Sequence, residues 1–386
     1  MTTDKTWGLS PSGLALCDCI QATDNARQSQ GARKLLELLG DSAFETANDN
    51  DVDCMVGHAL GEQAGAEWKD AHASIESRMN RLMAELDSVA ELLHAHGIPV
   101  VALKNAGIAR GLFDCLGCCP MGDLDLMVRK SDFREAHQLL VDDGYEFEFR
   151  SEFEENDLEE AERGGGSEYF KMLPDGSKLW LELQWRPVAG RWIRPDQEPD
   201  STELMGRSVE IPGSHVRLLS PQDNLLQVAL HTAKHTYVRA PGLRLHTDVD
   251  RILLRQEIDW REFVDRTRKL RLCTAVYFSL LIPSHVLGTQ VPDWVLAELR
   301  PSRWKVAVLS SWIRQAGLTE PNRRKFTRLR YIAFNSLLYD DLSGFLKGLF
   351  PSPEWVLERY GSRNRLVLPI LYARRLWELL FRRANT

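Results

Sequence analysis

Between residues 98 and 185 the sequence departs from helical periodicity, and this stretch constrains the fold more than any other part of the chain. Residues 98–103 (Ile-Pro-Val-Val-Ala-Leu) form a short apolar run that predicts a buried strand. Residues 123–128 alternate polar and apolar side chains, which is the period of a strand. The remaining signals predict helices over 106–112 and 131–142, a strand over 145–150, and two strands over 168–173 and 178–185 around the turn Asp175-Gly176. This order predicts a small α/β unit with a mixed sheet.

Helical patterns flank this unit on both sides. Residues 12–96 carry apolar side chains at helical spacing, most regularly over 74–96 before Gly97, and the pattern is again helical from Pro221 onward. We therefore expect an α+β protein with three parts. They are an N-terminal helical segment (1–96), a mixed-sheet α/β domain (97–190) and a helical C-terminal domain (191–386). The acidic stretch over 152–162 is expected to be a solvated flexible loop.

The overall charge narrows the classes of function. The 386 residues include 48 Lys+Arg and 55 Asp+Glu, giving a net charge of −7. General nucleic-acid binding is disfavoured because it needs a net basic surface. The apolar runs fall short of the roughly 20 residues that cross a bilayer, and the first residues lack the apolar core of a signal peptide. Seven cysteines without a repeating spacing indicate reduced thiols, so we expect a cytoplasmic protein that does not contact membranes.

The pair Asp123 and Asp125 is the sharpest chemical signal. On a strand, residues two positions apart project from the same face, so their carboxylates would lie side by side and repel each other without a cation. Hard oxygen ligands favour Mg²⁺ or Mn²⁺. Lys104, at the end of the first predicted strand, is suited to hold a phosphate. Glu182 stands in an otherwise apolar strand, where a carboxylate is costly without a partner. Three acids and a lysine predict a two-metal site for phosphoryl or nucleotidyl transfer.

The sequence around these residues resembles a known family. The runs Val100-Val-Ala-Leu-Lys-Asn-Ala-Gly107 and Met121-Gly-Asp-Leu-Asp-Leu-Met-Val128, with Asp143-Gly-Tyr145 after a helix, are similar to the uncharacterised nucleotidyltransferase family of the polymerase-β-like superfamily. Leu230-His231-x3-His235, Leu243-Arg244-x3-Asp248, Leu349-Phe-Pro351 and Tyr360 extend the likeness, which covers roughly residues 75–380. Two positions depart from the family pattern: Asn105 stands where the family has Gly, and Gln184 replaces the His of its Leu-His-Trp motif.

The resemblance implies a nucleotidyltransferase domain that uses an NTP substrate and Mg²⁺ or Mn²⁺. It implies that Asp123 and Asp125 bind both metal ions and that Glu182 binds the catalytic ion. It also assigns nucleotide or substrate binding to Lys104, Gly122, His231 and Arg244. The expected reaction moves a nucleoside monophosphate to a hydroxyl or phosphate on a small molecule, peptide or protein, and pyrophosphate leaves.

Other readings of the same residues stay open. The enzyme would alternatively transfer another group, such as a glycosyl unit, from a nucleotide-activated donor. A nucleotide-binding protein without catalysis and a toxin–antitoxin role are further alternatives. His231 and His235 on one helix face would equally fit a helix–helix contact, and Arg244 and Asp248 would simply pair.

Cysteine spacing raises one further question. Cys115 and Cys118 form a Cys-x2-Cys step. Structural zinc normally takes four ligands, commonly from two such steps, and the sequence contains no second one. We therefore expect no zinc site at these cysteines.

Overall fold

The computed structural model describes residues 5–150, 156–173, 176–187 and 193–381. Its contacts group the chain into two compact units that alternate along the sequence. The first unit comprises Met1–Arg81, Ile108–Met121 and Pro221–Asp340. The second comprises Leu82–Gly107, Gly122–Ser220 and Asp341–Thr386. The long helix α5 (Ala66–Ala95) and the short helix α6 (Lys104–Gly111) contribute residues to both.

A mixed sheet organises the second unit. Within the described residues it has seven strands in the order β3-β4-β5-β2-β1-β7-β6. β2 runs parallel to β5 and antiparallel to β1, and β1 runs parallel to β7. The strands are β1 (Val100–Ala102), β2 (Asp123–Met127), β3 (Glu146–Phe147), β4 (Gly166–Met172), β5 (Lys178–Gln184), β6 (Val209–Glu210) and β7 (Val216–Leu218).

The central strands are buried because β1 is apolar on both faces and β2 is apolar on one face and partly apolar on the other. All three residues of β1 are buried, as are four of the five residues of β2. On one face, Val101 and Met127 join Leu204 and Met205 in an apolar cluster. This cluster fixes helix α9 (Ser201–Arg207) against the sheet. The same face of β2 continues from Met127 to Asp125 and Asp123, so the apolar packing gives way to carboxylates along a single strand.

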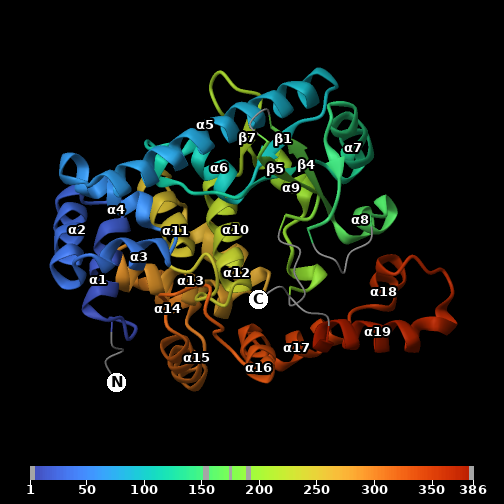
Figure 1. Ribbon diagram of the computed structural model, residues 1–386. Coiled ribbons are helices and arrows are strands. Elements are labelled where there is room, and N and C mark those ends of the chain that lie inside the picture. The colour runs from blue at the N-terminus through green and yellow to red at the C-terminus, as the bar shows by residue number, and fades with distance from the viewer. Residues whose placement is uncertain (1–4, 151–155, 174–175, 188–192, 382–386) are drawn as a thin grey trace. The chain divides into compact units, whose positions relative to one another are not determined.

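Further helices belong to the second unit. Helix α7 (Phe133–Asp142) lies beside the sheet (Figure 1), and its buried face includes Phe133, Ala136 and Leu140. The hydroxyl of Tyr145, just after α7, donates a hydrogen bond of 2.8 Å to Glu85 of α5. The remaining helices are α8 (Leu158–Gly164), α17 (Leu342–Leu349), α18 (Pro353–Arg359) and α19 (Leu368–Phe381).

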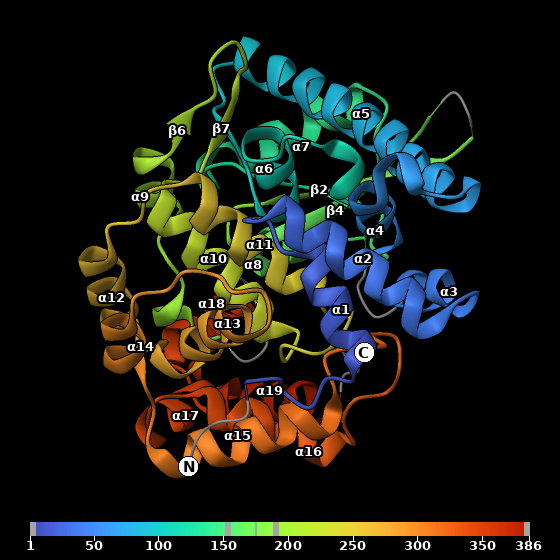
Figure 2. The same ribbon diagram turned by 90° about the vertical axis from the view of Figure 1, so that its left-hand side faces the viewer.

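The first unit is helical. Its centre is formed by three buried helices, α10 (Pro221–Lys234), α11 (Arg244–Arg255) and α13 (Cys273–Val286), which pack on one another (Figures 1 and 2). Helices α1 (Pro11–Ile20) and α2 (Asn25–Leu39) lie side by side in Figure 2. The others are α3 (Ser42–Asn48), α4 (Asp53–Leu60), α12 (Trp260–Lys269), α14 (Asp293–Leu299), α15 (Arg303–Ala316) and α16 (Arg328–Leu338).

The α+β class predicted from the sequence is confirmed: one mixed sheet is accompanied by many helices. The acidic stretch expected as a loop is partly helical, because Asp157 caps α8 and accepts a hydrogen bond from the backbone of Glu160. Asp175 of the predicted turn lies outside the described residues. The sheet also takes in β6 and β7, which follow residue 190 in the sequence. The division into three consecutive domains stays a prediction. No helix in the described ranges has the length and apolar character needed to cross a membrane.

Candidate active site

The register between β2 and β5 brings three carboxylates to one place. Asp125 pairs with Glu182 across these parallel strands, and Asp123 lies two residues before Asp125 on β2. In parallel neighbours, paired residues point to the same side of the sheet, and alternate residues of one strand share a face. Asp123, Asp125 and Glu182 therefore lie on one face. Their side chains are 25%, 7% and 30% exposed, so Asp125 is the buried member of the group.

Lys104 contacts two of these acids. Its Nζ lies 2.6 Å from Oδ1 of Asp125 and 3.6 Å from Oε2 of Glu182. The main chain directs it there, because β1 ends beside β2 and the backbone N–H of Leu103 donates to the carbonyl oxygen of Asp125 at 2.9 Å. Burial alone would lower the pKa of Lys104, but the Asp125 and Glu182 carboxylates outweigh it and raise that pKa. Lys104 is thus held as a cation within the acid cluster.

Backbone strain accompanies this position. Lys104 has φ of +49°, in the left-handed region that side chains other than Gly rarely adopt. Strain of this kind is stored where the surrounding structure fixes it, often at functional sites. The family pattern has its Gly one residue later, at the position of Asn105. Here the positive φ falls on the lysine itself, and Asn105 lies within α6.

A second donor shares the same oxygen of Asp125 with Lys104. Nε2 of Gln184 donates to Oδ1 of Asp125 at 2.8 Å, and the Gln184 side chain is buried. Burial raises the pKa of Asp125 well above its ordinary value. Lys104 opposes that rise, while the neighbouring Asp123 and Glu182 add to it. Gln184, the residue that replaces the family's His, is therefore in direct contact with the central acid.

Arg150 pairs with the outer acid. Its Nη2 lies 2.7 Å from Oδ2 of Asp123, and its Nε lies 3.2 Å from Oε2 of Glu168 on β4. The guanidinium also lies over the ring of Trp180, 5.4 Å from its centroid. Arg150 and Glu168 were not identified from the sequence. The only available signal was a basic residue at the end of a predicted strand, which is common on protein surfaces.

Glycines adjoin the cluster at two points. A Cβ built on Gly122 would meet no atom within 4 Å, so the space beside Gly122, the residue before Asp123, is open. At Gly107, in α6, a Cβ would lie 2.6 Å from the carbonyl oxygen of Ala102. Gly107 therefore lets α6 approach the end of β1 closely. Backbone N–H groups at the start of a helix favour anions, and α6 starts at Lys104.

His231 and Arg244, the other two predicted binding residues, belong to the first unit. The ring of His231 on α10 and the ring of His235, the residue just after this helix, lie edge to face with centroids 4.7 Å apart. Arg244 begins α11 and lies near the buried Asp248. Burial raises the pKa of Asp248 to about 7, opposed by Arg251 and Arg244. The structure brings four of the predicted site residues together within the second unit: Lys104, Asp123, Asp125 and Glu182. A role for His231 and Arg244 at this site stays a prediction.

A comparison with protein families identifies the class of this chain. The model of a family described as uncharacterised nucleotidyltransferase matches residues 34–288. The chain belongs to this nucleotidyltransferase family. A search of curated proteins found no match.

Family membership supports transfer of a nucleoside monophosphate from an NTP as the general reaction. The match includes β2, β5, α6 and the residues on them that form the acid cluster. The match begins at residue 34, before the stretch of roughly residues 75–380 whose motifs resemble the family. It ends before the Leu349-Phe-Pro351 motif and Tyr360, so those two features lie outside the matched stretch.

Proposed function

We propose that the protein is a metal-dependent nucleotidyltransferase whose site is the acid cluster on β2 and β5. The observation that carries the proposal is the pairing of Asp125 with Glu182 across parallel strands, with Asp123 on the same face. It would transfer a nucleoside monophosphate from an NTP to a hydroxyl or phosphate group on a small molecule, peptide or protein.

The donor set fits Mg²⁺ or Mn²⁺. Three carboxylates supply only hard oxygen ligands, which these ions prefer. Two cations, Lys104 and Arg150, now contact the carboxylates of Asp125 and Asp123. Clustered carboxylates thus have their charge offset in the structure by cationic side chains, and a divalent ion would serve the same purpose. When bound, the metal would supply charge stabilisation for the phosphate oxygens.

The chain's own residues have distinct roles in this proposal. Asp123, Asp125 and Glu182 would hold the metal ions, and Gln184 orients Asp125 through its hydrogen bond. Glu182 is the most exposed of the three acids and would accept the proton of an attacking hydroxyl. Lys104 would hold phosphate oxygens as a point charge, together with the N-terminus of α6 and the open space at Gly122. His231 and Arg244 are proposed to contact the nucleotide or acceptor.

An assay with labelled nucleotides tests the reaction. The full chain is incubated with Mg²⁺, each NTP labelled at the α-phosphate, and pools of sugars, nucleotides, peptides and proteins as acceptors. We expect pyrophosphate release coupled to label transfer. The variants Asp123→Asn, Asp125→Asn and Glu182→Gln should each lower the rate at least about 100-fold, because metal binding contributes several kcal/mol to transition-state stabilisation.

Glu146→Gln provides the matched control. Glu146 is an exposed carboxylate on the edge strand β3 of the same sheet, so its loss should leave the rate unchanged. Pyrophosphate release that survives Asp125→Asn would refute the site. NTP binding that depends on Asp125, without turnover in any acceptor pool, would refute transfer and favour a binding protein.

A further inference from the structure

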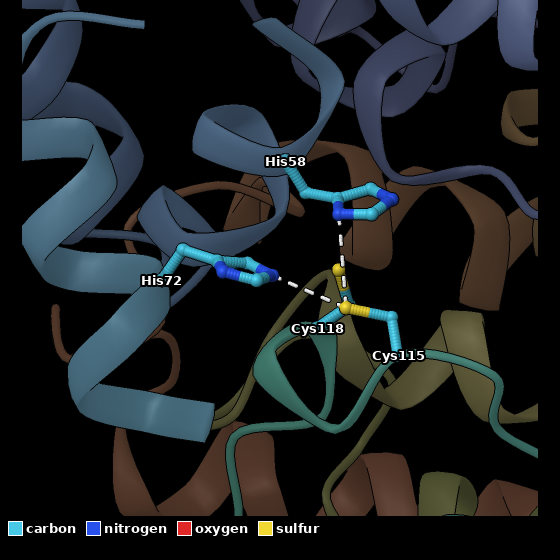
Figure 3. A group of neighbouring side chains, drawn as sticks. All are labelled: His58, His72, Cys115 and Cys118. Carbon is cyan, nitrogen blue, oxygen red and sulfur yellow. Dashed lines mark hydrogen bonds between the residues drawn. The ribbon is translucent and has the colours of Figure 1, made fainter. Parts of the chain in front are cut away.

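Four side chains with metal-binding atoms meet in the first unit, and none of them belongs to the acid cluster described above. They are His58 on α4, His72 on α5, Cys118 on the short turn η2 (Leu116–Cys118) and Cys115 just before that turn (Figure 3). One ligand atom from each lies within 4.8 Å of all the others. The two imidazoles and both sulfur atoms point toward a common centre in Figure 3.

Two of the separations are close to those around a tetrahedral ion. With bonds of about 2.3 Å to sulfur and about 2.0–2.1 Å to nitrogen, neighbouring ligand atoms lie about 3.3–3.8 Å apart. Nε2 of His72 lies 3.1 Å from Sγ of Cys115, and Nδ1 of His58 lies 3.7 Å from the same sulfur. The remaining pairs of ligand atoms lie within 4.8 Å of one another.

The backbone of the turn supplies a second, independent observation. A Cβ on Gly117 would lie 2.5 Å from Nε2 of His72, so a larger residue would displace the imidazole from the two cysteines. The backbone N–H of Cys118 donates to the carbonyl oxygen of Cys115 at 3.1 Å, which brings both thiols to one side of the turn. Glycine at this position therefore allows a histidine from a different helix to reach the Cys-x2-Cys turn.

We propose that His58, His72, Cys115 and Cys118 bind one Zn²⁺ ion. Two thiolates and two neutral imidazoles balance the charge of the ion, which suits a partly buried position. Soft thiolate and imidazole ligands select zinc over Mg²⁺. On binding, the thiol protons pass to solvent and metal–sulfur bonds replace the S–H bonds. Four protein ligands leave no open position, so the site is structural.

The ligands already interact without a metal. A hydrogen bond from Cys118 is the largest effect on the pKa of the Cys115 thiol. With the hydrogen bonds from His58 and His72 it outweighs burial and lowers that pKa to about 3. Other cysteines near the turn differ in this respect: burial raises the pKa of Cys54 and of Cys119 to about 12. The lowered pKa is specific to Cys115, because the same hydrogen bond, together with burial, raises the pKa of the Cys118 thiol.

Zinc at this position would tie three separate segments together. The short stretch 61–65 joins α4 to α5, whereas residues 96–115, which include β1 and α6, separate α5 from η2. η2 is followed closely by Gly122 and Asp123. The site has no second cysteine pair, because the other two ligands are histidines on α4 and α5.

Metal analysis of the full-length protein tests the proposal. We expect one zinc per chain after purification without chelator, and loss of that zinc in Cys118→Ser and His72→Gln. The controls are Cys273→Ser, at a partly buried cysteine outside the cluster, and His96→Gln, at an exposed histidine just after α5. Both should keep the zinc. Removing zinc from the wild type with a chelator should lower its melting temperature.

Spectroscopy of the wild type avoids variants that fail to fold. X-ray absorption at the zinc edge should show two sulfur and two nitrogen neighbours, and Co²⁺ in place of zinc should give a thiolate charge-transfer band. The proposal is overturned by a chain that neither retains zinc nor binds added ZnCl₂ stoichiometrically. Zinc with oxygen neighbours alone, retained by Cys118→Ser, would also overturn it, because that ion would sit at carboxylates.

Discussion

Replacement of Lys104 separates the energy of its buried ion pair from the cost of its backbone conformation. Lys104→Met removes the cation that lies 2.6 Å from Asp125, and leaves a carboxylate that is 7% exposed without this partner. Breaking a buried pair costs about 3–5 kcal/mol. Each kcal/mol corresponds to about 2–4 °C in a unit of this size, so the melting temperature should fall by about 6–20 °C.

Lys104→Gly removes the same cation but also relieves the left-handed backbone at φ +49°. Relief of that conformation gains about 1–2 kcal/mol, whereas the freedom that Gly adds to the unfolded chain costs about 0.5–1 kcal/mol. We therefore expect Lys104→Gly to be more stable than Lys104→Met by about 0.5–1 kcal/mol, although both are less stable than the wild type.

Differential scanning calorimetry of the three proteins in one buffer measures both effects. If Lys104→Gly melts at or below the temperature of Lys104→Met, the backbone at this residue is not strained. If Lys104→Met melts with the wild type, the pair with Asp125 contributes nothing and the description of a buried ion pair is wrong. Both variants should also lose NTP transfer, because the lysine is proposed to hold phosphate oxygens.

Three further predictions follow from individual contacts. Gly107→Ala should lower the melting temperature by several degrees, because the new Cβ would lie 2.6 Å from a carbonyl oxygen of β1, whereas Gly206→Ala, in open space on α9, should not. Arg150→Met should tighten Mn²⁺ binding, because the ion no longer competes with a guanidinium that lies 2.7 Å from Asp123. Electron paramagnetic resonance of the free Mn²⁺ during a titration measures this, and equal or weaker binding would contradict it. The pKa of Asp248 is raised to about 7 in the folded chain. The stability of the wild type should therefore fall more steeply than that of Asp248→Asn as pH rises from about 4 to 7. If the two proteins lose stability equally over this pH range, the carboxyl is not perturbed.

The elements around the site could be predicted because each carries a local pattern. The alternation over 123–128 and the apolar run over 98–103 became β2 and β1, and the i, i+2 rule placed Asp123 and Asp125 on one face. Glu182 was predicted from its burial cost. Its pairing with Asp125 depends on the register of two strands, which the sequence does not state but which follows if both apolar faces are to be buried.

The missing parts depend on contacts that are distant in sequence. β6 and β7 have two and three residues, too few to show a period, and β7 is stabilised by pairing with β1 more than a hundred residues earlier. Arg150 reaches Asp123 from beyond the end of a short strand. His58 and His72 approach the cysteine turn only because helices pack there. The local sequence of a helix does not show which of its residues will contact residues of another element.

The central claim is that Asp123, Asp125 and Glu182 form the metal-binding centre for an NTP. A crystal structure of the full chain with Mn²⁺ and a non-hydrolysable NTP, with anomalous scattering recorded at the manganese edge, tests this most directly. We predict manganese peaks within bonding distance of the carboxylates of Asp123, Asp125 and Glu182, and the triphosphate beside Lys104 and the start of α6. Manganese and nucleotide bound elsewhere, with Lys104 still paired to Asp125, would contradict it.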